Sequence, residues 1–318
     1  MTESYFDTLK RHGLKLSVAM FLGGLLYSAF YYVVLILYVI VAFLLIAIFS
    51  SASYILEGDT DQLADNLASE PGGMVLIAVL ILLFFVTLLL PHSFWTAGAY
   101  GAASASVFRG EWSIGYFFTT GFRHLWKMFG QQILLILFFI GPALLMLPFI
   151  SFLAVNGGSE VVLLIFLLLF FILLFVLSIG YLWISLHSPL IMIAERTGVW
   201  DSIRLAFRLT VKKPGQTLLS GLIALGISLG AYGLVLPIVF VLFILFDVLT
   251  GGNEIVRVIL GIFLLLTILF VAYYALSASL LSIAHRYKTR LRSYLFPEDP
   301  DRERAFVGTT PGYAPNNW

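Results

Sequence analysis

The chain has 318 residues and a formal net charge of only +1, with 61% hydrophobic and 11% charged residues. Soluble globular proteins have about 25% charged residues, so this composition excludes an ordinary water-soluble domain. The near-zero net charge provides no broad positive field for nucleic acid, and no nucleic-acid partner is expected. The absence of cysteine removes disulfides, thiolate nucleophiles and cysteine-ligated zinc sites. The class that remains is an integral membrane protein.

Six apolar runs are long enough to cross a bilayer, since about 20 helical residues at ~1.5 Å each span ~30 Å of hydrocarbon. The first run follows Lys10, Arg11 and Lys15 and extends from Leu16 to Phe49. It is far longer than the ~7–15-residue core of a cleavable signal peptide, so we interpret it as a retained span. The six runs lie at residues 18–50, 73–95, 130–154, 160–193, 216–248 and 256–284. The sequence therefore predicts an all-α, polytopic transmembrane helical bundle of about six spans.

The positive charges indicate how the spans are oriented. If the spans alternate in direction, one common face receives nearly all basic residues, namely Lys10, Arg11, Lys15, Arg109, Arg123, Lys127, Arg196, Arg204, Arg208, Lys212, Lys213 and the run from Arg286 to Arg292. The connections on the other face are acidic or neutral, with Arg257 as their only basic residue. Because Lys- and Arg-rich loops stay in the cytoplasm, we expect a multi-pass protein of the cytoplasmic (inner) membrane with both termini cytoplasmic.

Two connections on the basic face, residues 112–129 and 200–213, are longer than a turn and amphipathic. Aromatic and aliphatic residues alternate there with Arg and Lys. This pattern is typical of helices that lie in the membrane interface with their basic side chains toward anionic headgroups. We therefore expect interfacial amphipathic helices beside the spans.

These two connections also resemble each other. Residues 122–131 and 207–216 share five identities in ten positions at a constant offset of 85 residues. With residues 6–11 as a first interfacial helix, the pattern predicts three tandem units, each an interfacial helix followed by two spans, within one membrane domain at 1–292. Residues 293–318 have too little apolar content to fold, and we expect a disordered cytoplasmic tail.

Two histidines, His92 and His187, lie in or near the cytoplasmic halves of the second and fourth spans. An ionisable group at that depth is costly and often functional, so both are candidates for a polar path, as a proton relay or a polar substrate contact. The alternative is structural. Pro91 and Pro189 kink their helices, and each neutral imidazole bonds a neighbouring carbonyl or lies in the headgroup zone.

Few other patterns carry chemistry. The sequence has no His-x-x-x-His or Glu-x-x-His pair and no Gly-rich nucleotide loop, so we expect no metal and no cofactor. A Gly-x-Ser-x-Gly match at 226–230 lies inside a span, where the strand-to-helix turn of a hydrolase cannot form. Glu195 and Asp201 flank the second interfacial segment, where capping is favoured over catalysis. The apolar cores contain almost no charged residues, which disfavours an ion-coupled transporter.

The stretch from Glu195 to Leu218, which reads ERTGVWDSIRLAFRLTVKKPGQTL, resembles the segment after the fourth span in a group of bacterial polytopic membrane proteins. The group includes YesL-like proteins, YciC-like proteins and the membrane domain found beside glycerophosphodiester phosphodiesterases. Residues 109–113 and the following stretch to 131 are similar to the YesL-like version. The resemblance implies a membrane domain of unknown biochemical role, sometimes fused to or encoded near lipid-processing or transport machinery. No catalytic residue is carried over.

We therefore expect a non-enzymatic accessory or scaffold protein that contacts membrane lipids at their headgroups, or a membrane protein partner. The contact residues would be the basic residues of the two interfacial segments, Arg123, Lys127, Arg204, Arg208, Lys212 and Lys213. The alternative is a transporter or permease-like protein for a small or lipidic solute, with His92 and His187 lining the path. A membrane-embedded enzyme acting on lipid is the third hypothesis, and it requires a pH-dependent activity that is lost when either histidine is changed.

Overall fold

The computed structural model describes residues 4–49, 71–110, 112–139, 141–146, 150, 160–249 and 254–296. Within them the regular structure is helical and no strand occurs, which confirms the all-α prediction. The helices are α1 (Tyr5–Phe49), α4 (Pro71–Phe108), α5 (Ile114–Phe139), α6 (Gly141–Leu144), α8 (Glu160–Ala194), α9 (Val199–Lys212), α10 (Pro214–Leu249), α11 (Glu254–Arg286), the π-helical turn η1 (Tyr287–Leu291) and α12 (Arg292–Leu295).

Five stretches within the described residues are long and apolar enough to cross a membrane: Tyr5–Ala47, Val75–Phe108, Val161–Ala194, Pro214–Phe246 and Glu254–Leu295. They coincide with the first, second, fourth, fifth and sixth predicted spans. Many large apolar side chains along them are exposed, as expected where lipid surrounds the helices and each backbone polar group is satisfied within its own helix. The chain is therefore a helical membrane protein.

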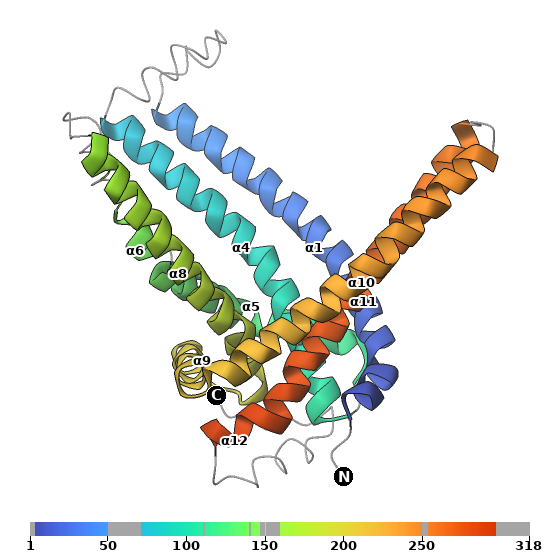
Figure 1. Ribbon diagram of the computed structural model, residues 1–318. Helices are drawn as coiled ribbons and strands as arrows, with labels where there is room; N and C mark the ends of the chain where they lie inside the picture. The colour runs from blue at the N-terminus through green and yellow to red at the C-terminus, as the bar shows by residue number, and fades with distance from the viewer. Residues whose placement is uncertain are drawn as a thin grey trace.

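The third predicted span, 130–154, lies partly outside the described residues. Its first part continues from the expected interfacial segment 112–129 without a break, because both belong to α5. α5 begins at the same end of the molecule where α4 finishes, whereas α8 begins at the opposite end (Figure 1). The first residues of α5 and of α8 therefore lie at opposite ends of the molecule.

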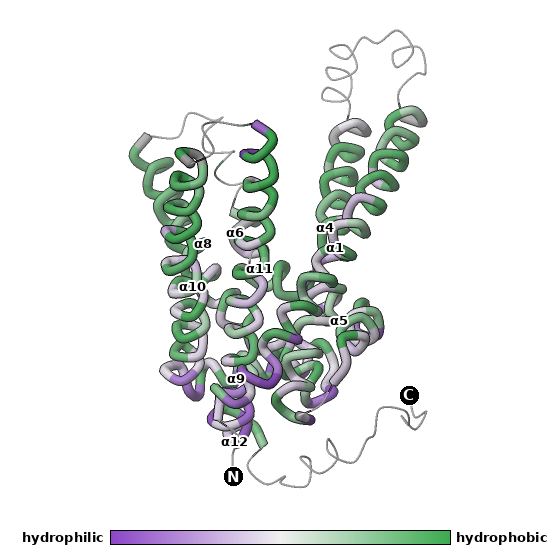
Figure 2. The backbone as a smooth tube through the Cα atoms, turned by 90° about the vertical axis from the view of Figure 1, so that its right-hand side faces the viewer, coloured by the Kyte–Doolittle hydropathy of each residue, from purple (hydrophilic) through white to green (hydrophobic). Residues whose placement is uncertain are grey.

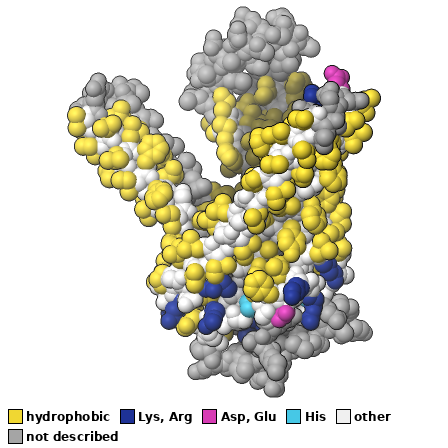
Figure 3. Space-filling model, turned by 45° about the vertical axis from the view of Figure 1, so that its right-hand side comes forward, with side chains coloured by type: hydrophobic (Ala, Val, Ile, Leu, Met, Phe, Trp, Pro, Cys, Tyr) yellow, Lys and Arg dark blue, Asp and Glu magenta, His cyan; other side chains and the backbone are white. Residues whose placement is uncertain are grey.

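Two packed helix pairs form arms that meet at one end of the molecule (Figure 1). α1 and α4 form one arm, and α10 and α11 form the other. The two arms diverge away from their junction, and α8 extends apart from both, as Figures 1 and 2 together show. The residues along the diverging parts are mostly hydrophobic (Figure 2). The start of α1, α9 and α12 lie at the junction, where most of the visible Lys and Arg side chains gather (Figure 3). This end is called the basic end below.

The buried core lies toward the basic end, where the last turns of α4, α8 and α11 meet the first part of α1 and α5. Its members include Leu16, Met20, Phe94, Ala97, Ala102, Ala103, Phe117, Met128, Leu190, Ile191, Leu209, Leu281 and Tyr287. Small side chains on α4 let the other helices approach closely in lipid, where packing and not water exclusion drives helix association.

Two stripes of small residues occur in the spans, and they have different surroundings. A Cβ added at Gly98 on α4 would stand 2.7 Å from a ring carbon of Phe117 on α5, so this stripe brings two helices into close contact. A Cβ added at Gly226 or Gly230 on α10 would meet no atom of the described structure within 4 Å. Only the α4 stripe therefore packs against a neighbouring helix here.

The segments η1 and α12 close the basic end. Lys288 Nζ donates a 3.0 Å hydrogen bond to the carbonyl of Val107, which ties η1 to the last turn of α4. α12 includes residues 293–295, the first residues of the expected tail, and residues 297–318 lie outside the described part of the chain. α12, the last helix of the described residues and called the C-terminal helix below, is thus part of the packed end of the bundle.

Candidate functional site

α9 is an amphipathic helix with two distinct faces. Its buried face comprises Ser202, Ile203, Ala206 and Leu209. Its exposed face comprises Trp200, Arg204, Phe207, Arg208, Val211 and Lys212. Aromatic rings exposed beside cations are typical of a helix in the membrane interface, where the rings reach the headgroup level and the cations meet anionic lipid.

The first half of α5 has a similar arrangement. Phe122 and Trp126 are 57% and 69% exposed, and Arg123 and Lys127 beside them are exposed as well. At the offset of 85 residues, Phe122, Arg123 and Lys127 correspond to the exposed Phe207, Arg208 and Lys212 of α9. These four residues of α5 and the exposed face of α9 are together called the interfacial surface.

Two basic residues at this end, Lys213 and Arg286, contact polar or aromatic side chains of the protein. Lys213 Nζ lies 4.4 Å above the centre of the Tyr294 ring, and Lys213 is half-buried. Arg286 donates hydrogen bonds from Nε to Ser220 Oγ at 3.0 Å and from Nη2 to Gln216 Oε1 at 3.2 Å. Of the six predicted contact residues, Lys213 therefore differs from the other five, which are exposed.

Buried hydrogen bonds position the two helices of the interfacial surface. Gln131 Nε2 on α5 donates to Ser202 Oγ on α9 at 2.6 Å. The neighbouring Gln132 accepts a 2.9 Å hydrogen bond from Ser93 Oγ on α4. Both glutamines are buried, and a hydrogen bond in a low-dielectric interior is costly to break. The repeated sequence motif ends at Gln131, but sequence spacing alone did not identify its partner.

A cavity of about 380 Å³ lies between the two arms. It is lined by Gly24 and Tyr27 of α1, His92 and Trp95 of α4, Tyr232 of α10, and Leu269, Ala272, Tyr273 and Leu276 of α11. Trp95 Nε1 donates to the carbonyl of Met20 at 3.3 Å, which holds the indole between α4 and α1. The cavity thus combines an apolar wall with polar aromatic side chains.

Of the two predicted path residues, His92 lines this cavity and His187 does not. His187 on α8 is 1% exposed, and its Nδ1 lies 3.2 Å from the carbonyl of Trp183 one turn earlier. Its Nε2 has no hydrogen-bond partner among the described residues. The two histidines therefore do not share one cavity.

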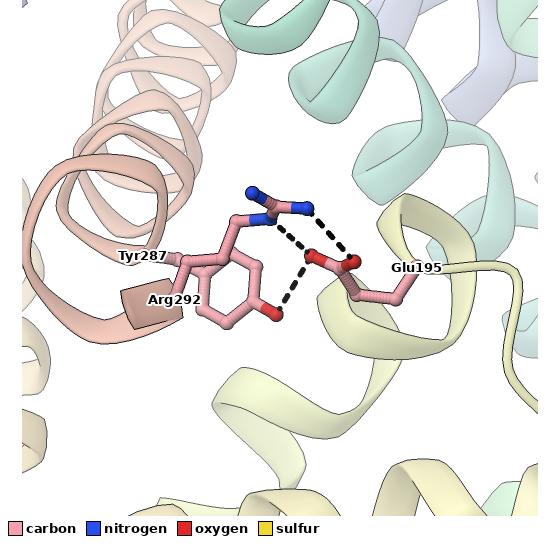
Figure 4. A network of polar contacts seen from close by, with 3 residues as sticks. All are labelled: Glu195, Tyr287 and Arg292. Atoms are coloured by element: carbon pink, nitrogen blue, oxygen red, sulfur yellow. Dashed lines mark hydrogen bonds and ion pairs between the residues drawn. The ribbon is translucent and has the colours of Figure 1, made fainter. Parts of the chain in front are cut away.

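A buried ion pair joins the end of α8 to the C-terminal helix. Arg292 Nε donates to Glu195 Oε1 at 2.8 Å, and Tyr287 donates to the same oxygen at 3.1 Å. Figure 4 shows the three side chains pointing toward one another. Glu195 lies between the end of α8 and the start of α9, as the sequence predicts, and it forms an ion pair with Arg292. Asp201 lies in the first turn of α9, whose N-cap, Gly198, makes no side-chain cap.

Few other groups of side chains in the described part of the chain have the residue types for metal binding or catalysis. No group of three or more His, Asp or Glu side chains there could hold a metal ion. Ser228, from the Gly-x-Ser-x-Gly match, lies inside α10 and shares a 2.9 Å hydrogen bond with Ser279 Oγ of α11. That geometry belongs to helix packing, with no imidazole beside the hydroxyl.

No protein-family model matches the chain, and neither a curated protein nor a solved structure matches it. The functional argument therefore rests on the interfacial surface and on the cavity between the arms.

Proposed function

We propose that this protein is a non-enzymatic accessory or scaffold protein of the cytoplasmic membrane whose interfacial surface binds anionic lipid headgroups. The observation that supports this most directly is the repeated exposure of a Phe-Arg pair and a Lys, at residues 122, 123 and 127 of α5 and 207, 208 and 212 of α9. Exposed apolar rings at this end would be unfavourable in water but suit the boundary between headgroups and acyl chains.

The charge of the interfacial surface suits the proposed ligand. Each Lys or Arg near an anionic membrane surface contributes about 1 kcal/mol, so five exposed cations together favour anionic over zwitterionic lipid. They are Arg123, Lys127, Arg204, Arg208 and Lys212. Because this attraction is screened within a Debye length, of ~8 Å at physiological salt, it should weaken as salt is raised.

The test compares two triple variants of α9. Arg204→Gln/Arg208→Gln/Lys212→Gln removes three charges, whereas Arg204→Lys/Arg208→Lys/Lys212→Arg keeps them. Full-length proteins are reconstituted in nanodiscs with equal dioleoylphosphatidylglycerol and dioleoylphosphatidylcholine, and the lipids that stay bound are measured by native mass spectrometry. The proposal predicts enrichment of the anionic lipid in the wild type and in the charge-keeping variant, and its loss in the neutral one. Equal enrichment in all three would refute it.

The same surface could instead recruit a membrane protein partner, and purification from native membranes distinguishes the two. A stoichiometric protein that stays bound to the wild type and is lost from the neutral triple variant would move the proposal from lipid to protein contact. We also propose kinship with the YesL-like group, because the stretch from Glu195 to Leu218 that resembles it contains α9.

Orientation is part of the proposal and has its own test. The chain has no cysteine, so a single introduced cysteine is a unique label. Ser4→Cys and Ser293→Cys lie at the basic end, whereas Glu254→Cys lies at the start of α11 at the far end of its arm. A membrane-impermeant maleimide applied outside intact cells should label only position 254. Labelling of position 4 or 293 from outside would overturn the cytoplasmic placement of the termini.

A transporter or permease-like role for a small or lipidic solute is the second candidate, and the cavity favours it. His92 lines that cavity. Flux of common solutes and of fluorescent lipids into proteoliposomes, compared with empty vesicles and with a His92→Phe variant, tests it. Rates equal to those of empty vesicles would refute the transporter role, and only the accessory role would remain.

A further inference from the structure

An apolar groove lies on α10 and α11, farther from the basic end than the cavity between the arms. The groove has a volume of about 760 Å³ and is lined by Leu236, Pro237, Val239, Phe240, Phe243, Gly261, Leu264, Leu265 and Ile268. Along α11, positions 261, 265, 268, 272 and 276 follow a spacing of three or four residues, and the last two line the cavity. Along α10, positions 232, 236, 240 and 243 do the same. Residues at this spacing share one helix face, so cavity and groove form one continuous strip.

The polar end of this strip lies at a defined depth. Tyr27 is 22 residues from the far end of α1 and Tyr273 is 19 residues from the far end of α11, which places both rings roughly 28–33 Å along their helices. His92 and Trp95 lie at a similar distance from the start of α4. Measured along the helices, that distance is close to the ~30 Å thickness of the hydrocarbon layer. The cavity therefore lies nearer the basic end than the groove does, and the groove lies within the hydrocarbon.

The polar groups in the cavity are hydrogen-bonding but uncharged. Among the described residues no hydrogen bond is formed by the hydroxyls of Tyr27, Tyr232 and Tyr273, and the ring of His92 has one hydrogen-bond contact, with Thr96 of its own helix at 3.4 Å. None of the residues lining the cavity is Lys, Arg, Asp or Glu. A bound phosphate would lack a cation there, and burying an unpaired charge is costly, whereas hydroxyl and carbonyl groups would satisfy the tyrosines.

From this arrangement we infer that the strip is a binding site for one neutral membrane lipid. Its uncharged head, with hydroxyl and ester carbonyl groups, occupies the cavity of Tyr27, His92, Tyr232 and Tyr273, and its acyl chain lies in the groove beside Gly261. From residue 261 to residue 276 the strip extends about 22 Å along α11, longer than the ~15 Å of one leaflet's hydrocarbon. This site shares no residue with the interfacial surface, so it can be tested independently of the proposed headgroup contacts.

The test uses dioleoylglycerol with a photoreactive diazirine in one acyl chain. Full-length protein in dioleoylphosphatidylcholine nanodiscs is irradiated with the probe, and the labelled peptides are mapped by mass spectrometry. Labels are expected within residues 236–243 and 261–268. Unlabelled dioleoylglycerol should compete with the probe, and dioleoylphosphatidylglycerol should not. Labels spread evenly over the exposed faces of all spans, or equal competition by the anionic lipid, would overturn the inference.

Matched variants separate the site from general lipid contact. A Cβ at Gly261 meets no atom of the described residues within 4 Å, so Gly261→Leu projects into the groove without a clash and should lower labelling about tenfold. Gly230→Leu on α10 is equally unobstructed, lines neither the groove nor the cavity, and should leave labelling unchanged. The double variant Tyr232→Phe/Tyr273→Phe keeps both rings and should weaken competition by dioleoylglycerol about tenfold. Equal labelling of the Gly261 and Gly230 variants would refute the site, while the neutral triple variant of α9 should label normally.

Discussion

Arg292 Nε lies 2.8 Å from Glu195 Oε1, and the two side chains, 97 residues apart in sequence, are 9% and 0% exposed. The second guanidinium contact, from Nη2 to Glu195 Oε2, measures 3.5 Å. The pair joins the end of α8 to α12 and so fixes the C-terminal helix to the basic end. A buried ion pair is costly to desolvate, and breaking it by removing one partner leaves an uncompensated charge.

Replacing one partner of this pair should therefore be worse than replacing both. Arg292→Met alone should lower the free energy of unfolding by about 3–5 kcal/mol, and Glu195→Leu/Arg292→Met should recover most of that loss. Unfolding of the purified protein in mixed micelles of detergent and sodium dodecyl sulfate, followed by circular dichroism, measures both. A double variant as unstable as the single one would show that the ion pair itself stabilises the fold.

Tyr287→Phe probes the hydrogen bond to the same carboxylate. The hydroxyl donates to Glu195 at 3.1 Å, and Tyr287 is fully buried. Its loss should cost about 1.5–3 kcal/mol, the range for a hydrogen bond to a charged group. Tyr294→Phe is the control, because Tyr294 is 44% exposed and its ring stays beside Lys213, so its effect should stay within about 0.5 kcal/mol. Equal effects of the two changes in the same unfolding assay would contradict the assigned contact.

His124 on the interfacial helix α5 should make stability depend on pH. Burial lowers the pKa of His124 from its usual 6.5, and the nearby charges of Lys127, Arg123 and Arg196 lower it further, against the raising effect of its contact with the Thr120 carbonyl. Because the unfolded chain then binds this proton more tightly, His124 contributes to the free energy of unfolding. This contribution is complete above pH 6.5 and is lost as the pH falls toward the pKa of the folded protein.

Two variants check this pH dependence. His124→Asn cannot titrate, so its melting temperature should fall less steeply than that of the wild type as the pH is lowered below 6.5. Lys127→Gln removes a neighbouring positive charge and should raise the pKa of His124 in an NMR titration of ¹³C-labelled histidine. Arg204→Gln, on the exposed face of α9, is the charge-matched control. A pKa of His124 that does not respond to Lys127→Gln would disprove the electrostatic part of the cause.

The length of the apolar runs was sufficient to predict five spans, because the thickness of the bilayer sets how many consecutive apolar residues a helix needs to cross it. The ends of the helices were harder to predict. α4 continues past the apolar run to Phe108, and α1 begins as early as Tyr5. A helix satisfies its own backbone hydrogen bonds on both sides of the lipid boundary, so nothing in the hydropathy marks where it stops. The two helices expected at the interface formed, but α5 continues toward the next span without a break.

The candidate sites depended on tertiary packing, and the sequence revealed only parts of them. His92 was identified because an ionisable group in an apolar run is unusual. The sequence did not point to Tyr27, Tyr232 and Tyr273, because tyrosine is common near membrane interfaces. Only the packing of α1, α10 and α11 places these three residues around one cavity. Glu195 was noticed, but its partner lies 97 residues away, a separation that no local pattern encodes.

The close approach of α1, α4 and α5 is the last feature to test, and it depends on glycine. A Cβ at Gly23 of α1 would stand 2.2 Å from a ring carbon of Phe117, whose side chain is fully buried. Gly23→Ala should therefore cost about 1–3 kcal/mol through overpacking. Phe117→Leu in the same chain makes room, so the two changes together should cost at least 0.5 kcal/mol less than their sum, roughly the lower limit of coupling between residues in contact. At Gly226 a Cβ would meet no atom of the described residues within 4 Å, so Gly226→Ala should be neutral or stabilise the protein by up to about 1 kcal/mol. If the Gly23→Ala and Gly226→Ala variants unfold at the same concentration of sodium dodecyl sulfate, the contact between α1, α4 and α5 does not depend on glycine.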